Sequence, residues 1–194
     1  MPHGAARSSK RGLHNLNMEP NLASVVRDWH DFYGLVGTAS ATLVGLMFIA
    51  ASVGASIFNA SQQEPMKAYL TPTVAHFSSL LFVCILILIP TQTWLSLSMA
   101  VGGLGIAGIA YSIRQWIRVF LTLRSRIDWA DRMFYVFIPG LGYALVLVSA
   151  VALFEHRRSS AELMAAALIV LLLAGIRNAW DMTVWIITRS QTRA

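Results

Sequence analysis

Long apolar runs separated by short polar stretches dominate the chain. Residues 32–63 contain no Asp, Glu, Lys or Arg, and neither do residues 68–113. A bilayer core is about 30 Å thick, and a helix of roughly 20 apolar residues crosses it. Backbone groups inside lipid must be paired within their own segment, so such runs are expected to be helical. The pattern predicts an all-α, polytopic transmembrane helical bundle.

The polar breaks predict about five membrane-spanning helices. Residues 68–113 are too long for one crossing and are divided at the turn residues 90–93 (PTQT). Thr71-Pro72 resembles a helix cap followed by proline at the first helical position, and residues 159–162 (SSAE) resemble a capping box. Pro139-Gly140 is expected to kink the fourth helix. The predicted helices cover about 31–59, 72–89, 94–113, 133–154 and 160–188.

These helices are expected to form one transmembrane domain, residues 21–189. Residues 1–20 are polar and basic, without the apolar region of a signal peptide, and are predicted to be a disordered tail. Residues 190–194 form a C-terminal tail. Residues 21–30 are amphipathic and are expected to lead into the first spanning helix. Met18 opens the patterned part and is a candidate natural start in place of Met1.

Composition agrees with a membrane protein. The chain has 194 residues, 56% hydrophobic and 12% charged, whereas a soluble domain carries roughly 25% charged residues. Cys84 is the only cysteine, so it cannot form an intramolecular disulfide and is expected to pack as a small apolar side chain. Cys/His spacing typical of a metal site is absent.

The segment after the third helix is basic and contains tryptophan. Trp116 and Ile117 fall on one side at helical spacing, and Arg114 and Arg118 lie mainly on the other. We expect the third helix to extend to about residue 127 as an interfacial helix facing anionic headgroups; a solvated loop helix is the alternative. Basic residues with aromatics can indicate nucleic acid, but membrane spans flank this segment, so no nucleic-acid partner is expected.

Tryptophan and arginine at the ends of the spans predict anchors and orientation. Tryptophan prefers the headgroup zone, and Lys and Arg favour cytoplasmic loops. The expected membrane-interface anchors are Trp29, Trp116, Arg118, Trp129 and Trp185. With the N-terminus outside, the inner side holds Lys67, Arg114, Arg118, Arg124, Arg126, Arg132, Arg189 and Arg193, and the outer side holds Arg27, Arg157 and Arg158. The tail adds Arg7, Lys10 and Arg11 outside without reversing the difference. An N-out, C-in orientation is predicted.

The first spanning helix carries small residues along one side. They include Gly34, Gly37, Ala41 and Gly45. Small residues at this spacing let helix backbones approach closely in lipid. Packing within the chain is the simplest interpretation, and a pore-lining or oligomer face is the alternative. Gly105, Gly108 and Ser112 form a second, shorter stripe on the third helix.

Charged side chains interrupt the last apolar run at residues 177–181 (RNAWD). Arg177 and Asp181 are four residues apart and share a stripe with Asn178. A charge at bilayer depth costs at least ~2.5–3.5 kcal/mol, and an Arg–Asp pair offsets part of that cost through shared hydrogen bonds. An interhelical or interfacial clasp is the simpler interpretation of this polar cluster. The functional interpretation is a gate, an ion pathway or a proton site.

Signals for catalysis or cofactor binding are weak. His76 is the one histidine placed inside a predicted span, whereas a membrane cytochrome needs histidines paired across facing helices. Hydrogen bonding or headgroup contact is expected for His76, and no metal or cofactor is predicted. G-x-S-x-G, H-E-x-x-H and Walker patterns are absent, so no catalytic residue is predicted. A membrane-embedded enzyme is the third alternative for function.

Three short runs resemble a group of small bacterial polytopic membrane proteins. They are residues 29–32 (WHDF), 37–48 (GTASATLVGLMF) and 177–181 (RNAWD). The resemblance implies a bacterial inner membrane and two ends of the chain that belong together. The group has no established activity, so the resemblance supplies no catalytic residue.

The sequence as a whole favours a non-enzymatic packing or regulatory protein that self-associates in the bilayer through the first helix. Its expected partners are lipid, anionic headgroups at the interfacial helix and further copies of the same chain. The alternative is a channel or transporter for an ion or small solute. In that case Arg177 and Asp181 control passage, and the small residues Gly37, Ala41 and Gly45 permit it.

Overall fold

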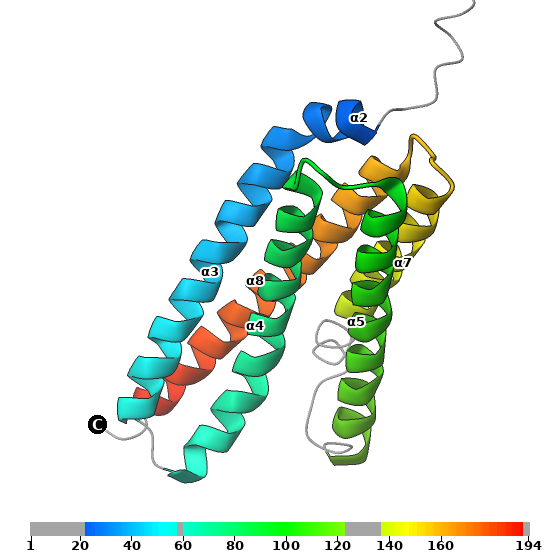
Figure 1. Ribbon diagram of the computed structural model, residues 1–194. Coiled ribbons are helices and arrows are strands. Elements are labelled where there is room, and N and C mark those ends of the chain that lie inside the picture. The colour runs from blue at the N-terminus through cyan, green and yellow to red at the C-terminus, as the bar shows by residue number, and fades with distance from the viewer. Residues whose placement is uncertain (1–21, 58–59, 123–136, 192–194) are drawn as a thin grey trace, which may run out of the picture.

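The computed structural model describes residues 22–57, 60–122 and 137–191, and these residues form helices joined by short turns (Figure 1). The helices are α2 (Leu22–Asp28), α3 (His30–Ile57), α4 (Ala60–Leu88), α5 (Trp94–Thr122), α7 (Ile138–Phe154) and α8 (Ser160–Gln191). The described part contains no strand, which confirms the all-α class. The predicted tail at residues 1–20 lies outside the described residues. At the other end α8 continues through Gln191, past the predicted end of the domain.

Within the described residues, four helices are long and apolar enough to cross a membrane. Their candidate spans are His30–Gly54, Leu70–Leu88, Trp94–Ile117 and Ser160–Val184. Helix α7 is apolar but has 17 residues. The chain is therefore a transmembrane protein, and the predicted number of about five is close, since α7 is the fifth apolar helix.

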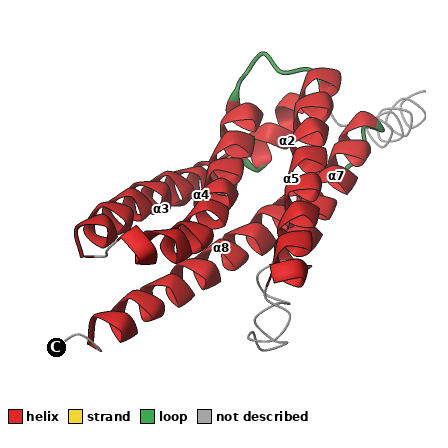
Figure 2. Cartoon of the chain, turned by 90° about the horizontal axis from the view of Figure 1, so that it is seen from below, coloured by secondary structure: helices red, strands yellow, loops and turns green. Residues whose placement is uncertain are grey.

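The five long helices alternate in direction along the bundle. The start of α3 and the end of α8 consequently lie at opposite ends, and α2 lies across the end at which α3 begins (Figure 1). The spatial order differs from the chain order, because α3 packs on α4, α4 on α8, α8 on α7, and α7 on α5. Figure 2 shows α3 and α4 on one side and α5 and α7 on the other, with α8 running between them.

The turn between α4 and α5 is where the sequence predicts it. Thr93 precedes α5, and its Oγ1 accepts a hydrogen bond from the Ser96 amide at 3.1 Å. The Thr93 amide donates in return to Ser96 Oγ at 3.0 Å. This reciprocal cap satisfies amide groups that a helix start otherwise leaves unpaired, so α5 begins at Trp94 as predicted. It then continues without a break to Thr122, in agreement with the predicted extension; residues 123–127 lie outside the described part.

One of the two predictions based on proline is wrong. Helix α4 begins at Ala60 rather than near Thr71, and Pro72 lies inside it. Proline has a helical φ angle, and membrane helices tolerate its missing amide. Pro139 lies in the first turn of α7, and Phe137 just before that helix already has helical backbone angles, so the predicted kink at Pro139-Gly140 stays a prediction. The absent N–H costs little there, because first-turn amides have no partner within the helix. Residues 133–136 lie outside the described part.

The connection between α7 and α8 closes with a left-handed residue. His156 has φ 55, its amide donates to the Leu153 carbonyl at 3.0 Å, and the Arg157 amide donates to the Ala152 carbonyl at 2.9 Å. This is the Schellman pattern, in which glycine usually holds the left-handed position. The His156 ring instead stacks on Trp94, with ring centroids 5.1 Å apart, so the stack joins this turn to the start of α5. Helix α8 then begins at Ser160, as predicted.

Glycines bring the central helices into close contact. A Cβ atom at Gly108 of α5 would lie 2.1 Å from the Tyr143 ring of α7, and one at Gly175 of α8 would lie 2.6 Å from the Phe77 ring of α4. Gly108 ends the run at residues 103–108 (GLGIAG), which matches the glycine spacing of a dinucleotide-binding loop. That loop requires a turn between a strand and a helix, whereas this run lies inside α5. Its second and third glycines therefore belong to the packing surface predicted for this helix.

We expect Gly108→Ala to lower the free energy of unfolding by about 1–3 kcal/mol, because the Tyr143 ring has to move. Gly103→Ala in the same helix is the matched control, since nothing lies within 4 Å of its Cβ position; alanine there is expected to be neutral or to stabilise by up to about 1 kcal/mol. Chemical unfolding in detergent micelles measures both values. Equal stability of the two variants would contradict this packing.

Candidate functional site

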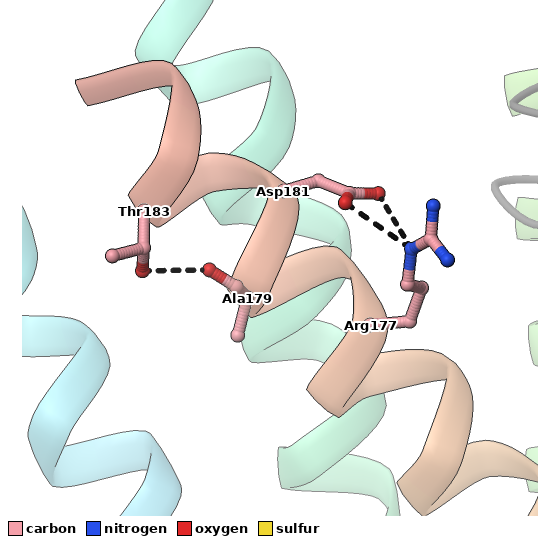
Figure 3. Close-up of polar contacts among 4 residues, drawn as sticks. All are labelled: Arg177, Ala179, Asp181 and Thr183. Atoms are coloured by element: carbon pink, nitrogen blue, oxygen red, sulfur yellow. Dashed lines mark hydrogen bonds and ion pairs between the residues drawn. The ribbon is translucent and has the colours of Figure 1, made fainter. Parts of the chain in front are cut away.

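The charged pair on α8 forms as the spacing predicts. Arg177 Nε donates to both carboxylate oxygens of Asp181, at 3.1 and 3.2 Å. Figure 3 shows the pair on one side of α8, with Thr183 on the opposite side, where its hydroxyl donates to the Ala179 carbonyl. The Arg177 and Asp181 side chains keep 47% and 24% of their surface exposed. The pair therefore lies at the periphery of its own chain.

The Asn178 side chain points away from this pair and into the bundle. Its side chain is 1% exposed, on the same face as the buried Ala174 and Met182, each one turn away. Consecutive helical residues differ by about 100°, so a neighbour of an outward residue can point inward. Neither amide atom of Asn178 has a hydrogen-bond partner. The predicted cluster thus consists of a satisfied ion pair beside a buried, unsatisfied amide.

The small residues of α3 serve packing within the chain at one position. A Cβ atom at Gly37 would lie 3.1 Å from Cys84 Cβ of α4, and Cys84 is buried and free, as predicted. At Gly34 and Gly45, by contrast, nothing lies within 4 Å of the Cβ position, and Ala41 is exposed. Close packing within the chain, the simplest interpretation of the stripe, therefore holds for Gly37 and fails for the other three positions.

A groove follows this part of α3. Its volume is about 300 Å³. Tyr33, Gly34, Gly37, Thr38 and Ala41 line it from α3, and Leu81, Cys84, Ile85 and Leu88 line it from α4. Apart from hydroxyl and thiol groups its walls are apolar, so it fits a hydrocarbon or a helix surface better than a polar solute.

The predicted interface anchors are only partly within the described residues. Trp29 is half-buried and meets the edge of the Phe32 ring, with centroids 5.7 Å apart. Trp116 is exposed near the end of α5. Arg118 and Trp185 lie in α5 and α8, but their side chains are outside the described part, as is Trp129 altogether. An anchoring role stays a prediction for each of them.

A buried polar network joins α4 to α7, and it was not predicted from the sequence. His76 Nδ1 lies 3.0 Å from the Tyr143 hydroxyl, and Ser79 Oγ lies 3.1 Å from the same hydroxyl. Ser79 also donates to the Ala75 carbonyl at 2.8 Å. One proton arrangement satisfies every contact: His76 donates to Tyr143, Tyr143 to Ser79, and Ser79 to Ala75. The hydrogen bonding expected of His76 is confirmed.

The signal for this network was present but incomplete. His76 and Ser79 stand three residues apart in an apolar run, which places them on one face of a helix. Tyr143 lies in another apolar run, which also contains Ser149, and its sequence position does not identify its partner. The Tyr143 ring packs against Gly108 of α5, and its hydroxyl reaches α4. This arrangement depends on the spatial order of the helices, which the sequence does not give.

Comparison with known proteins identifies no function for this chain, so a functional proposal has to rest on the geometry. Within the described residues, no group of three or more His, Cys, Asp or Glu side chains could hold a metal ion. The chain matches no protein-family model, no curated protein and no solved structure. The candidate features are therefore the exposed face of α3 with its groove, and the Arg177–Asp181 pair with Asn178.

We expect Asn178→Leu to raise the free energy of unfolding by about 1 kcal/mol or more, because it removes a buried amide that has no partner. The matched control is Ser149→Ala. Ser149 is also buried, but its hydroxyl donates to the Val146 carbonyl at 2.7 Å, so its loss is expected to be neutral or destabilising. Unfolding in mixed micelles measures both. A loss of stability in Asn178→Leu would show that the amide has a partner in the folded protein.

Proposed function

We propose that the protein is a non-enzymatic packing or regulatory protein that self-associates in the bilayer through α3. One observation carries this proposal. The small-residue face of α3 is defined as Gly34, Thr38, Ala41 and Gly45. All but the half-buried Gly34 are exposed, and no atom lies within 4 Å of the Cβ position of either glycine. Among Gly34, Gly37 and Gly45 of α3, Gly37, beside this face, is the one whose Cβ position lies against α4.

Membrane physics explains why such a face favours a second copy. Lipid tails are as apolar as the helices, so association depends on close van der Waals contact, which small residues permit. The face extends over twelve residues, and Gly34 and Gly45 are about 16 Å apart along the helix axis at ~1.5 Å per residue. Its Thr38 hydroxyl already donates to the Gly34 carbonyl at 2.9 Å, so it can enter an interface without leaving a polar group unpaired.

Helix α3 is also the spanning helix that its own chain covers least. Only 22% of the most apolar window of its span is buried, compared with 50% for α8. Large exposed side chains, Leu35, Phe48 and Ile49, stand beside the small-residue face. A ridge of large residues next to a flat strip of small ones suits two copies of α3 that pack against each other.

We place this assembly in the inner membrane of a bacterium, with the N-terminus outside and the C-terminus in the cytoplasm. The Lys and Arg distribution favours this orientation, and the start of α3 and the end of α8 lie at opposite ends of the bundle (Figure 1). Arg114 and Trp116 are exposed near the end of α5. In this orientation they meet the anionic headgroups of the inner leaflet.

The oligomeric state of the protein in the membrane tests the proposed self-association. Gly34→Leu and Gly45→Leu are expected to raise the dissociation constant of the oligomer at least tenfold, about 1.4 kcal/mol, because leucine separates the two backbones. Gly103→Leu is the matched control, since it adds the same side chain at an open position on α5. Subunit counting in lipid vesicles across a dilution series measures this. A monomeric wild type, or equal dissociation constants in all variants, contradicts the proposal.

The second candidate function is a channel or transporter for an ion or small solute. The buried, unpartnered amide of Asn178 next to the Arg177–Asp181 pair favours it, because intramembrane polar groups often line solute pathways. Wild type and Asp181→Asn are reconstituted in liposomes, and ion, proton and small-solute fluxes are measured. A channel predicts flux that Asp181→Asn changes and Gly103→Ala does not. Tight liposomes across the panel contradict this candidate.

A further inference from the structure

A small cavity lies beneath α2, at the end of the bundle where α3 begins. Its volume is about 20 Å³, and each of the six described helices contributes to its lining. Leu22, Val25 and Val26 of α2 line it together with Tyr33 of α3 and with Ser160 and Ala161 of α8. It is the place where the amphipathic segment α2 meets the spanning helices.

One polar side chain in this cavity lacks a partner. Ser160 is 0% exposed, and its Oγ has no hydrogen-bond partner. A buried hydroxyl in this state costs about 1–3 kcal/mol. Such groups in folded proteins are commonly satisfied by ordered water when space is available.

The backbone supplies a further donor at the same place. Ser160 opens α8, and the first amides of a helix have no acceptor within it. The Ser160 amide donates to the Arg157 carbonyl at 3.2 Å, and the Leu163 amide donates to the Ser159 carbonyl at 3.0 Å. The Ala161 amide stands between them, and Ala161 is buried and lines the cavity.

We propose that this cavity binds a single water molecule, held by Ser160 Oγ and the Ala161 amide. A bound water needs at least ~10–15 Å³ of such volume. The space of about 20 Å³ therefore suits one water and is too small for a lipid headgroup. This water satisfies the start of α8 while α2 covers it.

Charge argues against a small anion in the same space. A helix N-terminus offers only about half a positive charge, and Glu162 adds a negative side chain to this first turn. Most of the lining is apolar, and burying an unpaired ion in such surroundings costs far more than burying a neutral hydroxyl. A neutral ligand that both donates and accepts is the one that fits.

The test uses the full chain in lipid, with a structure determined at a resolution that shows ordered water. One peak is expected at a hydrogen-bond distance of roughly 2.7–3.2 Å from Ser160 Oγ. Ser160→Ala is expected to lose it. Ser149→Ala, which removes a buried hydroxyl that has its own partner, is expected to keep it. An empty cavity in the wild type overturns the proposal, and so does a peak that Ser160→Ala retains.

Two further measurements need only the wild type, so they do not depend on whether the variant folds. Bromide exchange followed by anomalous scattering should give no signal in the cavity; a signal there identifies an anion and overturns the proposal. Magnetization transfer from water to the Ala161 amide in detergent should show a water with a long residence time. Its absence also overturns the proposal. Both results are independent of the oligomeric state and hence of self-association through α3.

Discussion

Close contact between helix backbones is the interaction on which this bundle depends. Lipid provides no hydrophobic drive for one apolar helix to bind another, so packing and buried hydrogen bonds have to hold the helices together. Glycine supplies the packing at each interface of the central layer. Gly108 admits the Tyr143 ring between α5 and α7, Gly142 approaches Leu171 between α7 and α8, and Gly175 admits the Phe77 ring between α8 and α4. The position of the Tyr143 ring in turn brings its hydroxyl to His76 and Ser79.

Polar groups inside the apolar bundle are handled in different ways. Hydroxyls on the exposed side of α3, such as those of Thr38 and Thr42, donate to carbonyls one turn earlier in the same helix. They need no neighbour and leave that side free to face lipid or another helix. The hydroxyl of Tyr143 instead requires a second helix, because its partners His76 and Ser79 lie in α4. Asn178 and Ser160 follow neither pattern, and both are candidates for roles beyond packing.

Much of the fold follows from local signals in the sequence, and the rest depends on which helices meet. The turn at residues 90–93 and the starts of α5 and α8 are encoded by short polar runs, and these were predicted. Pro72 was misread as a helix start, because proline marks a first turn only when the preceding residues do not form a helix themselves. The sequence could not show that Asn178 is buried while Arg177 is exposed. A helical pattern gives the angles between side chains around the helix axis, but it does not show on which side the neighbouring helices pack. The same limit applies to Gly34, Ala41 and Gly45, whose spacing predicts a contact without naming the partner.

The order of the helices in space has a consequence for how the chain is made. Helices α3 and α4 form one hairpin and α5 and α7 another, and the two have little direct contact apart from Tyr143 with His76 and Ser79. Helix α8, which follows both hairpins in the chain, packs on both α4 and α7. During translation the two hairpins therefore have few contacts with each other until α8 leaves the ribosome. Until then the Phe77 ring of α4 lacks Gly175, against which it packs. Quality control that acts on incomplete membrane proteins would find a distinctive target in any product truncated before Ser160.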